Sequence, residues 1–231
     1  MTATIDPERT LAELVLEQPH LAPVFEQLGL DYCCGGQSRL TDAAAERGLV
    51  PAALTAALEA AERADGVSCT ERDWREATMT ELCDHIVEVH HAYLRRELPQ
   101  IDGLLTKVVD RHGGRAPELE RLQARFGELN GALIDHIDSE EQTVFPLCRS
   151  LESGGEARIV PRGLGVHEAE HAAVGQALRS MRELTGGYDP EQAFCTTHRV
   201  LLGSLQELEA DLHQHIHEEN NILFPRLQAQ T

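Results

Sequence analysis

The sequence predicts an all-α protein, a four-helix bundle preceded by a small helical unit. Aromatic residues make up only 4% of the 231 residues, and Ala, Leu and Glu are abundant, which favours helices over sheets. Apolar residues recur in alternating steps of four and three, as they do along the buried face of a helix. The stretches 136–146 and 215–225 are also near-copies of each other, each with His-Ile-x-x-Glu and then Phe-Pro.

Residues 1–65 are expected to form the small helical unit. Thr10 and Glu13 match a capping box at the start of a first helix. Further helices are expected at about 22–28, 40–47 and 51–63, the last with a proline at its first position. Between them, the segment Asp31-Tyr-Cys-Cys-Gly-Gly36 is predicted to be a turn or a helix entry, because paired glycines interrupt helical periodicity. Residues 66–77 are expected to be a linker.

The bundle is expected to occupy residues 78–231. Its four long helices are predicted at about 78–111, 117–150, 162–185 and 190–227, and glycine pairs mark the turns between them. Pro99, Pro146 and Pro225 fall late in these helical patterns, where each proline is expected to kink or end a helix.

The four helices read as two similar pairs, and each carries candidate metal ligands on its apolar stripe. A histidine precedes the stripe in the first and third helices, and a His-x-x-x-Glu pair follows the stripe in the second and fourth. In an up-down-up-down bundle these positions lie at the same end. The residues predicted to converge there are His91, His136, Glu140, His171, His215 and Glu219.

Four imidazoles and two carboxylates are too many ligands for one structural zinc ion, which usually takes four. They suit two ions bridged by the two carboxylates, as in the di-iron and di-manganese sites of bundle cores. The alternative is a set of polar core residues that satisfy one another. Glu88 and Glu170 lie near His91 and His171 and are candidates for orienting them. Five further histidines lie close to the ligands in the sequence: His85, His90, His167, His213 and His217. Any of them could support a ligand or replace one, but most are expected to lie at the surface.

Adjacent Cys33 and Cys34 are the second candidate functional feature. Two neighbouring thiols could be redox active, bind a soft metal or pass electrons. The alternative is a buried pair of small apolar side chains. The other cysteines are scattered along the sequence and are expected to be incidental: Cys69, Cys83, Cys148 and Cys195.

Composition excludes several classes of partner. A net charge of -19 argues against binding nucleic acid or an anionic membrane through a basic surface. The sequence has no apolar run of about 18 residues that would span a bilayer and no secretory signal. Six cysteines without a disulfide-framework spacing indicate a reducing compartment, so we expect a cytoplasmic protein.

The motifs resemble those of the repair-of-iron-centres family over nearly the whole chain. The resemblance rests on the segment 31–36, the Asp73-Trp74-Arg75 junction, and both His-Ile-x-x-Glu motifs. It implies a haemerythrin-like bundle with two non-haem iron ions per chain, held by the six residues named above. It also implies a functional role for Cys33 and Cys34, and damaged iron–sulfur proteins as partners. Oxygen-carrying haemerythrins have more histidines in their site, which makes simple oxygen carriage a weaker reading.

The leading hypothesis is therefore a stress-response protein that repairs iron–sulfur clusters damaged by nitric oxide or oxidants, by supplying iron. Two alternatives use the same site: a nitric oxide reductase, and a sensor that binds oxygen or nitric oxide. The sequence has no flavin or nucleotide motif, so a reductase would need electrons from a partner. Whether the protein is an enzyme stays open, and a homodimer is one option for its assembly.

Overall fold

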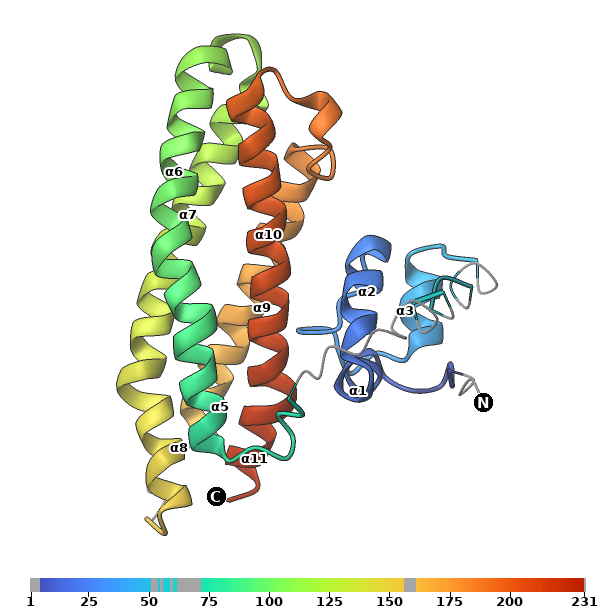
Figure 1. Ribbon diagram of the computed structural model, residues 1–231, viewed down its shortest axis with the longest axis vertical. Coiled ribbons are helices and arrows are strands. Elements are labelled where there is room, and N and C mark those ends of the chain that lie inside the picture. The colour runs from blue at the N-terminus through green and yellow to red at the C-terminus, as the bar shows by residue number, and fades with distance from the viewer. Residues whose placement is uncertain are drawn as a thin grey trace. The chain divides into compact units, whose positions relative to one another are not determined.

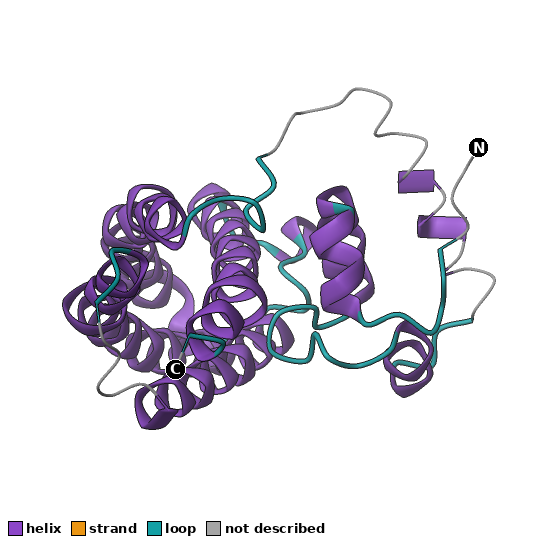
Figure 2. Cartoon of the chain, turned by 90° about the horizontal axis from the view of Figure 1, so that it is seen from below, coloured by secondary structure: helices purple, strands orange, loops and turns teal. Residues whose placement is uncertain are grey.

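Helices provide the regular structure of the part of the chain that the computed structural model describes, which is residues 5–50, 54, 56–58, 60–61, 72–155 and 161–230. No strand occurs among these residues, as Figure 2 shows by the absence of orange, although Thr10 and Arg39 form an isolated bridge. The chain divides into two units. The first comprises Met1–Ala77 and His213–Arg226, and the second comprises Thr78–Leu212 and Leu227–Thr231. The predicted all-α class is confirmed.

The first unit begins with three short helices, α1 (Leu11–Glu17), α2 (Ala22–Leu28) and α3 (Leu40–Glu46). The predicted capping box is present, because Thr10 Oγ1 accepts from the Glu13 amide and the Glu13 carboxylate accepts from the Thr10 amide. Helix α2 ends at Gly29, whose φ of 66° is left-handed and suits glycine. Most of the predicted helix 51–63 and part of the predicted linker lie outside the described residues.

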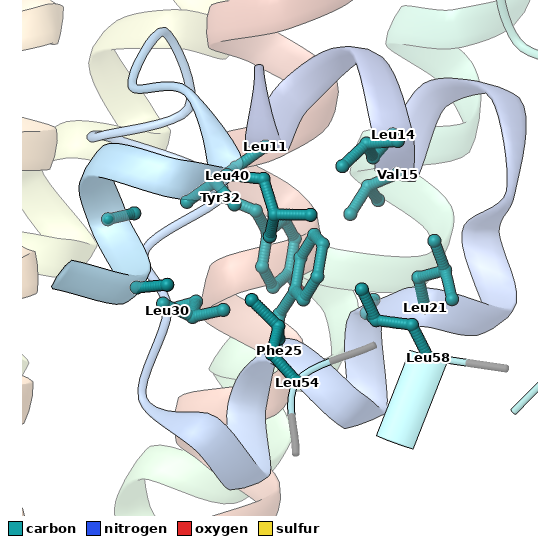
Figure 3. Packing of buried hydrophobic residues seen from close by; sticks show 13 residues of the cluster. Leu11, Leu14, Val15, Leu21, Phe25, Leu30, Tyr32, Leu40, Leu54 and Leu58 are labelled. Atoms are coloured by element: carbon teal, nitrogen blue, oxygen red, sulfur yellow. The ribbon is translucent and has the colours of Figure 1, made fainter. Parts of the chain in front are cut away.

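The core of the first unit is built around two aromatic rings. Phe25 and Tyr32 are buried with ring centroids 6.2 Å apart. Leucines of α1 and α3, and Leu21 and Leu30 on either side of α2, belong to the same core (Figure 3). The chain packs closely next to Tyr32, and this requires a glycine at position 36. A Cβ atom on Gly36 would lie 2.4 Å from the Tyr32 carbonyl oxygen and 2.9 Å from Ala12 Cβ, so only glycine allows this close approach.

The second unit is the predicted four-helix bundle. Its helices are α5 (Met79–His85), α6 (Ala92–His112), α7 (Pro117–Ser139), α8 (Phe145–Glu152), α9 (Pro161–Leu184) and the first part of α10 (Thr196–Glu218). The long helices α6, α7, α9 and α10 run side by side (Figure 1). Helix α7 packs against both α6 and α9, and α5 packs against α8. The apolar stripes predicted on the four long helices are buried, as Leu98, Leu129, Leu178 and Leu205 illustrate.

Three π-helical turns interrupt the predicted helices: Ile86–His91, Glu140–Val144 and Glu219–Leu223. Helices α8 and α11 (Phe224–Gln228) follow two of these turns directly, and Pro146 and Pro225 stand in their first turns. Because proline has no N–H to donate, a widened turn before it loses fewer helical hydrogen bonds. Pro99 does not end its helix, since α6 continues through it to His112.

The start of the fourth long helix differs from the prediction. The fourth long helix begins at Thr196 rather than near residue 190, because Pro190–Gln192 form a separate 3-10 turn. Gly186, Gly187 and Tyr188 before it all have positive φ, so the chain reverses direction sharply there. Within the described residues, no helix has the length and apolar character needed to cross a membrane.

Candidate metal centre

All six predicted ligand residues are buried, and none exposes more than 6% of its surface. They cluster around the π-helical turns. His91 is the last residue of the first turn, Glu140 is the first residue of the second, and Glu219 is the first residue of the third. The remaining three lie on long helices: His136 on α7, His171 on α9 and His215 on α10. A π turn re-aims side chains relative to a regular helix, and such turns are frequent at functional sites.

Among the candidate ligands in the bundle unit, Glu140 lies between His136 and His91. Its Oε1 atom lies 3.3 Å from His136 Nε2, and its Oε2 atom lies 3.5 Å from His91 Nε2. The two oxygens of one fully buried carboxylate therefore face two different imidazoles. A carboxylate placed in this way could hold a cation together with either histidine.

His171 adds a further imidazole beside His136, with 3.0 Å between the two Nε2 atoms. Two ligand atoms that are each about 2.1 Å from one ion and 90° apart are themselves separated by about 3.0 Å. Imidazole nitrogens and carboxylate oxygens that lie this close together in a buried site are typical ligands of a transition-metal cation. The donor set present in the bundle therefore fits a metal.

The outer ring nitrogens of two histidines contact carboxylates. His91 Nδ1 lies 2.8 Å from Glu141 Oε1, and His136 Nδ1 lies 2.7 Å from Glu170 Oε2. A carboxylate that accepts the Nδ1 proton leaves Nε2 as the metal-binding nitrogen and makes it more basic. Both Nε2 atoms point at Glu140, in agreement with this assignment of the proton.

Arg95 supports this arrangement from the outside. Its guanidinium donates to Glu141 at 2.7 Å and to Asp138 at 2.6 Å. Burial alone would raise the pKa of Glu141, but the hydrogen bonds from Arg95 and His91 outweigh it and lower this pKa. Glu141 therefore stays ionised and remains an acceptor for His91.

The sequence-based roles for the neighbouring carboxylates were partly wrong. Glu88 is exposed, and the partner of His91 is Glu141, which the sequence analysis did not identify. Glu170 contacts His136 and not the adjacent His171, because positions 170 and 171 point to different sides of α9. Glu141 directly follows the predicted ligand Glu140, and only this adjacency in the sequence could have indicated that Glu141 lies near the site.

The expectation that nearby histidines lie at the surface was also wrong for His90, His167 and His217, which are buried. Each imidazole has a polar partner that offsets its burial. His90 Nδ1 lies 2.9 Å from Asp211, and His167 Nδ1 lies 3.3 Å from Glu170. His217 Nδ1 lies 3.2 Å from the Tyr32 carbonyl oxygen.

The remaining predicted ligands, His215 and Glu219, form the second His-x-x-x-Glu pair, with 3.2 Å between His215 Nε2 and Glu219 Oε1. Their segment belongs to the first unit and packs against its helices. Glu26 on α2 holds His213 Nδ1 at 2.6 Å, and its Oε1 also accepts from the Tyr32 hydroxyl at 3.1 Å. The sequence did not indicate these long-range contacts.

The Cys33–Cys34 motif contacts the same segment, because Asn221 donates to the Cys33 carbonyl oxygen at 3.3 Å. Asp31 organises the motif by accepting from the amides of Cys34 and Gly35, both at 2.9 Å. The two sulfurs are 3.9 Å apart, which is too long for a disulfide bond. Cys33 is buried and Cys34 is partly exposed. The hydrogen bond with Cys34, followed by burial, raises the pKa of the Cys33 thiol well above its usual range.

Two family models match the chain in the same order as its predicted domains. Residues 82–227 match the haemerythrin HHE cation-binding domain. Residues 7–62 match a domain of unknown function that is also called the ScdA N-terminal domain. The first match covers all six candidate ligands, and the second covers Cys33 and Cys34.

Curated relatives are similar over nearly the full length. The iron-sulfur cluster repair protein YtfE of Edwardsiella ictaluri is 36% identical over 219 residues, which are 95% of this chain and 96% of the relative. The protein of the same name from Escherichia coli O157:H7 is 34% identical over 222 residues, 96% of this chain and 97% of the relative. That of Citrobacter koseri is 33% identical over the same shares of both chains.

Proposed function

The chain belongs to the family of iron–sulfur cluster repair proteins with a haemerythrin HHE domain, and we propose that it repairs iron–sulfur clusters damaged by nitrosative and oxidative stress. The observation that carries this proposal is similarity across both domains and nearly the full length of relatives named for that task. The buried bundle site supports it, because a cluster that has lost iron needs a source of that metal.

The cation-binding site is proposed to hold two non-haem iron ions per chain. Glu140 and Glu219 are the proposed bridging carboxylates, and each ion is proposed to take two of the four histidines His91, His136, His171 and His215. The matched pairs at His136–Glu140 and His215–Glu219, both with Nε2–Oε1 distances of 3.2–3.3 Å, support equal roles for the two halves. Bound iron would supply both redox chemistry and the metal ion that a damaged cluster requires.

The surrounding residues control protons and charge at this site. Glu141 and Glu170 hold the outer imidazole protons of His91 and His136, which keeps both inner nitrogens available to a metal. Arg95 keeps Glu141 ionised. Protonation or displacement of the buried Glu140 carboxylate would weaken its hold on a hard cation, so this residue is the proposed control point for iron release.

Cys33 and Cys34 are proposed to act in the repair step rather than in holding the resident iron. Their domain, proposed to span residues 1–65, is joined by a linker at 66–77 to the bundle domain at 78–231. Cys34 is the more reachable thiol, and its neighbour Cys33 is held protonated. The proposed partners are damaged iron–sulfur proteins, and nitric oxide and oxygen are the proposed small ligands. A cytoplasmic location is proposed because thiols persist in a reducing compartment.

The test is recovery of an iron–sulfur enzyme whose cluster has been destroyed by nitric oxide. Iron-loaded protein should restore its activity, and labelled iron should pass from this chain to the recovered enzyme. A Cys33→Ser/Cys34→Ser double variant should keep its iron but restore less activity. No recovery above buffer, together with steady nitric oxide consumption when a reductant is supplied, would favour the reductase alternative instead.

A further inference from the structure

Two cysteines far apart in the sequence come together at one end of the bundle. Cys83 lies on α5 and Cys148 lies on α8, and these helices pack against each other (Figure 1). Both side chains are fully buried, with 0% exposure. The interaction with the Cys83 side chain is the largest cause that lowers the pKa of Cys148. The sequence analysis treated both as incidental, because they come near each other only when α5 packs against α8.

The backbone around these cysteines is fixed on both sides. The residues that follow them, Asp84 and Arg149, form an ion pair with 2.6 Å between Asp84 Oδ1 and Arg149 Nη2. Near the helix ends, the Glu152 carboxylate accepts hydrogen bonds from the amides of Met79 at 2.8 Å and Thr80 at 3.0 Å. These contacts hold α5 and α8 in register at the two sulfurs.

We propose that Cys83 and Cys148 are a redox-active dithiol that hydrogen peroxide converts into an intramolecular disulfide bond between α5 and α8. The inference stands apart from the proposed function, because it uses neither the candidate metal ligands nor the Cys33–Cys34 motif. Peroxide is the oxidant class because it is small enough to reach a buried sulfur during local opening of the helix pair, whereas bulky thiol reagents are excluded.

The reaction balances with one peroxide molecule. The Cys148 thiolate attacks one peroxide oxygen, forming a sulfur–oxygen bond while the oxygen–oxygen bond breaks and hydroxide leaves. Cys83 then attacks the oxidised Cys148 sulfur, forming the disulfide bond as the second hydroxide leaves. The two thiol protons convert both hydroxides into water, so two sulfurs lose two electrons and the peroxide gains them.

Cys148 is assigned the attacking role on electrostatic grounds. The hydrogen bond from Cys83 lowers the pKa of Cys148, and the positive charge of Arg149 lowers it further, while burial opposes both. A thiol with more thiolate character is the better nucleophile toward peroxide. Cys83, on the helix packed against α8, is then the thiol that attacks the oxidised sulfur.

The experiment treats the iron-loaded full-length protein with hydrogen peroxide, quenches it with catalase, and unfolds it in the presence of an alkylating reagent. Peptide mass mapping without reductant should find the peptides of Cys83 and Cys148 joined, and reductant should separate them. The melting temperature should rise by on the order of 5 °C, because the bond closes a long loop in the unfolded chain. A Cys83→Ala variant should show neither the joined peptides nor the rise.

Exposed Cys195 serves as the internal control for oxidation. Complete alkylation of Cys83 and Cys148 in a sample whose Cys195 is oxidised would overturn the proposal, and so would a bond from either cysteine to a different partner. Mapping the parent protein decides the question even if Cys83→Ala fails to fold.

Discussion

At the scale of single residues, the burial of the Glu140 carboxylate is the feature of the bundle that most needs a compensating charge. It is fully buried, and each of its oxygens faces a different imidazole. A buried carboxylate without a compensating positive charge is costly, and histidines supply that charge only when protonated. A cation shared between the imidazoles would satisfy all three side chains together, which explains why such a residue is tolerated in an apolar helix interface.

Glu140→Gln should therefore lower iron content from the proposed two ions per chain and speed iron loss to a chelator by roughly tenfold or more, because an amide is a neutral and weaker ligand. Metal analysis and chelation kinetics measure both effects. Glu88→Gln is the matched control, since Glu88 is exposed on the neighbouring π turn and should leave both values unchanged. Equal iron retention in the two variants would remove Glu140 from the ligand set.

The two thiols of the Cys33–Cys34 motif should also differ measurably. Cys33 is buried and its pKa is raised, first by the hydrogen bond with Cys34 and then by burial, so little thiolate is available at neutral pH. Iodoacetamide should label Cys34 at least about tenfold faster than Cys33, since only the thiolate reacts. Exposed Cys195 provides the reference rate in the same digest. Faster labelling of Cys33 would show that the motif opens readily in solution.

At the scale of helices, the apolar stripes were predictable and the π turns were not. The steps of four and three placed residues such as Leu98, Leu129 and Leu205 correctly, because burial of one helix face imposes that period. A π turn adds only one residue to a turn, which shifts the pattern too little for a sequence period to reveal it. Pro146 and Pro225 gave a partial signal, since each marks a break that the structure resolves as a π turn followed by a new helix.

The start of α5 depends on a carboxylate from another helix. Glu152 of α8 accepts from two amides of the first turn of α5, in addition to the capping box of Thr78 and Glu81. Glu152→Ala should lower the free energy of unfolding by about 1–2 kcal/mol, because it leaves helix-terminal donors without this acceptor. Denaturant unfolding of the metal-loaded protein measures the change. Glu128→Ala, on the exposed surface of α7, is the control, and its free energy of unfolding should stay within about 0.5 kcal/mol of the parent value. An equal loss of stability in both variants would contradict the capping role of Glu152.

At the scale of the whole molecule, the division of the chain was only partly visible in the sequence. The described part of residues 1–65 forms helices around a core that contains Phe25 and Tyr32. However, the structural unit also includes His213–Arg226, which the repeat assigned to the fourth bundle helix. Sequence periodicity detects which face of a helix is buried but not which partner buries it. His213 and His217 were therefore expected to lie at the surface, although His213 contacts Glu26 and His217 contacts the Tyr32 carbonyl oxygen.

This arrangement predicts that a residue of the N-terminal unit tunes the iron site. Glu26 on α2 holds His213 at 2.6 Å, two residues before the proposed ligand His215. Glu26→Ala removes that contact and the acceptor of the Tyr32 hydroxyl, so the helix end that carries His215 and Glu219 should become more mobile. Iron should then pass to a chelator roughly fivefold faster, equivalent to about 1 kcal/mol, while iron content before chelation stays close to that of the parent. Glu8→Ala is the matched control, because Glu8 is exposed and pairs with Arg39 within the same unit. Identical release rates for both variants would mean that the packing of 213–226 against α2 has no influence on how iron is held.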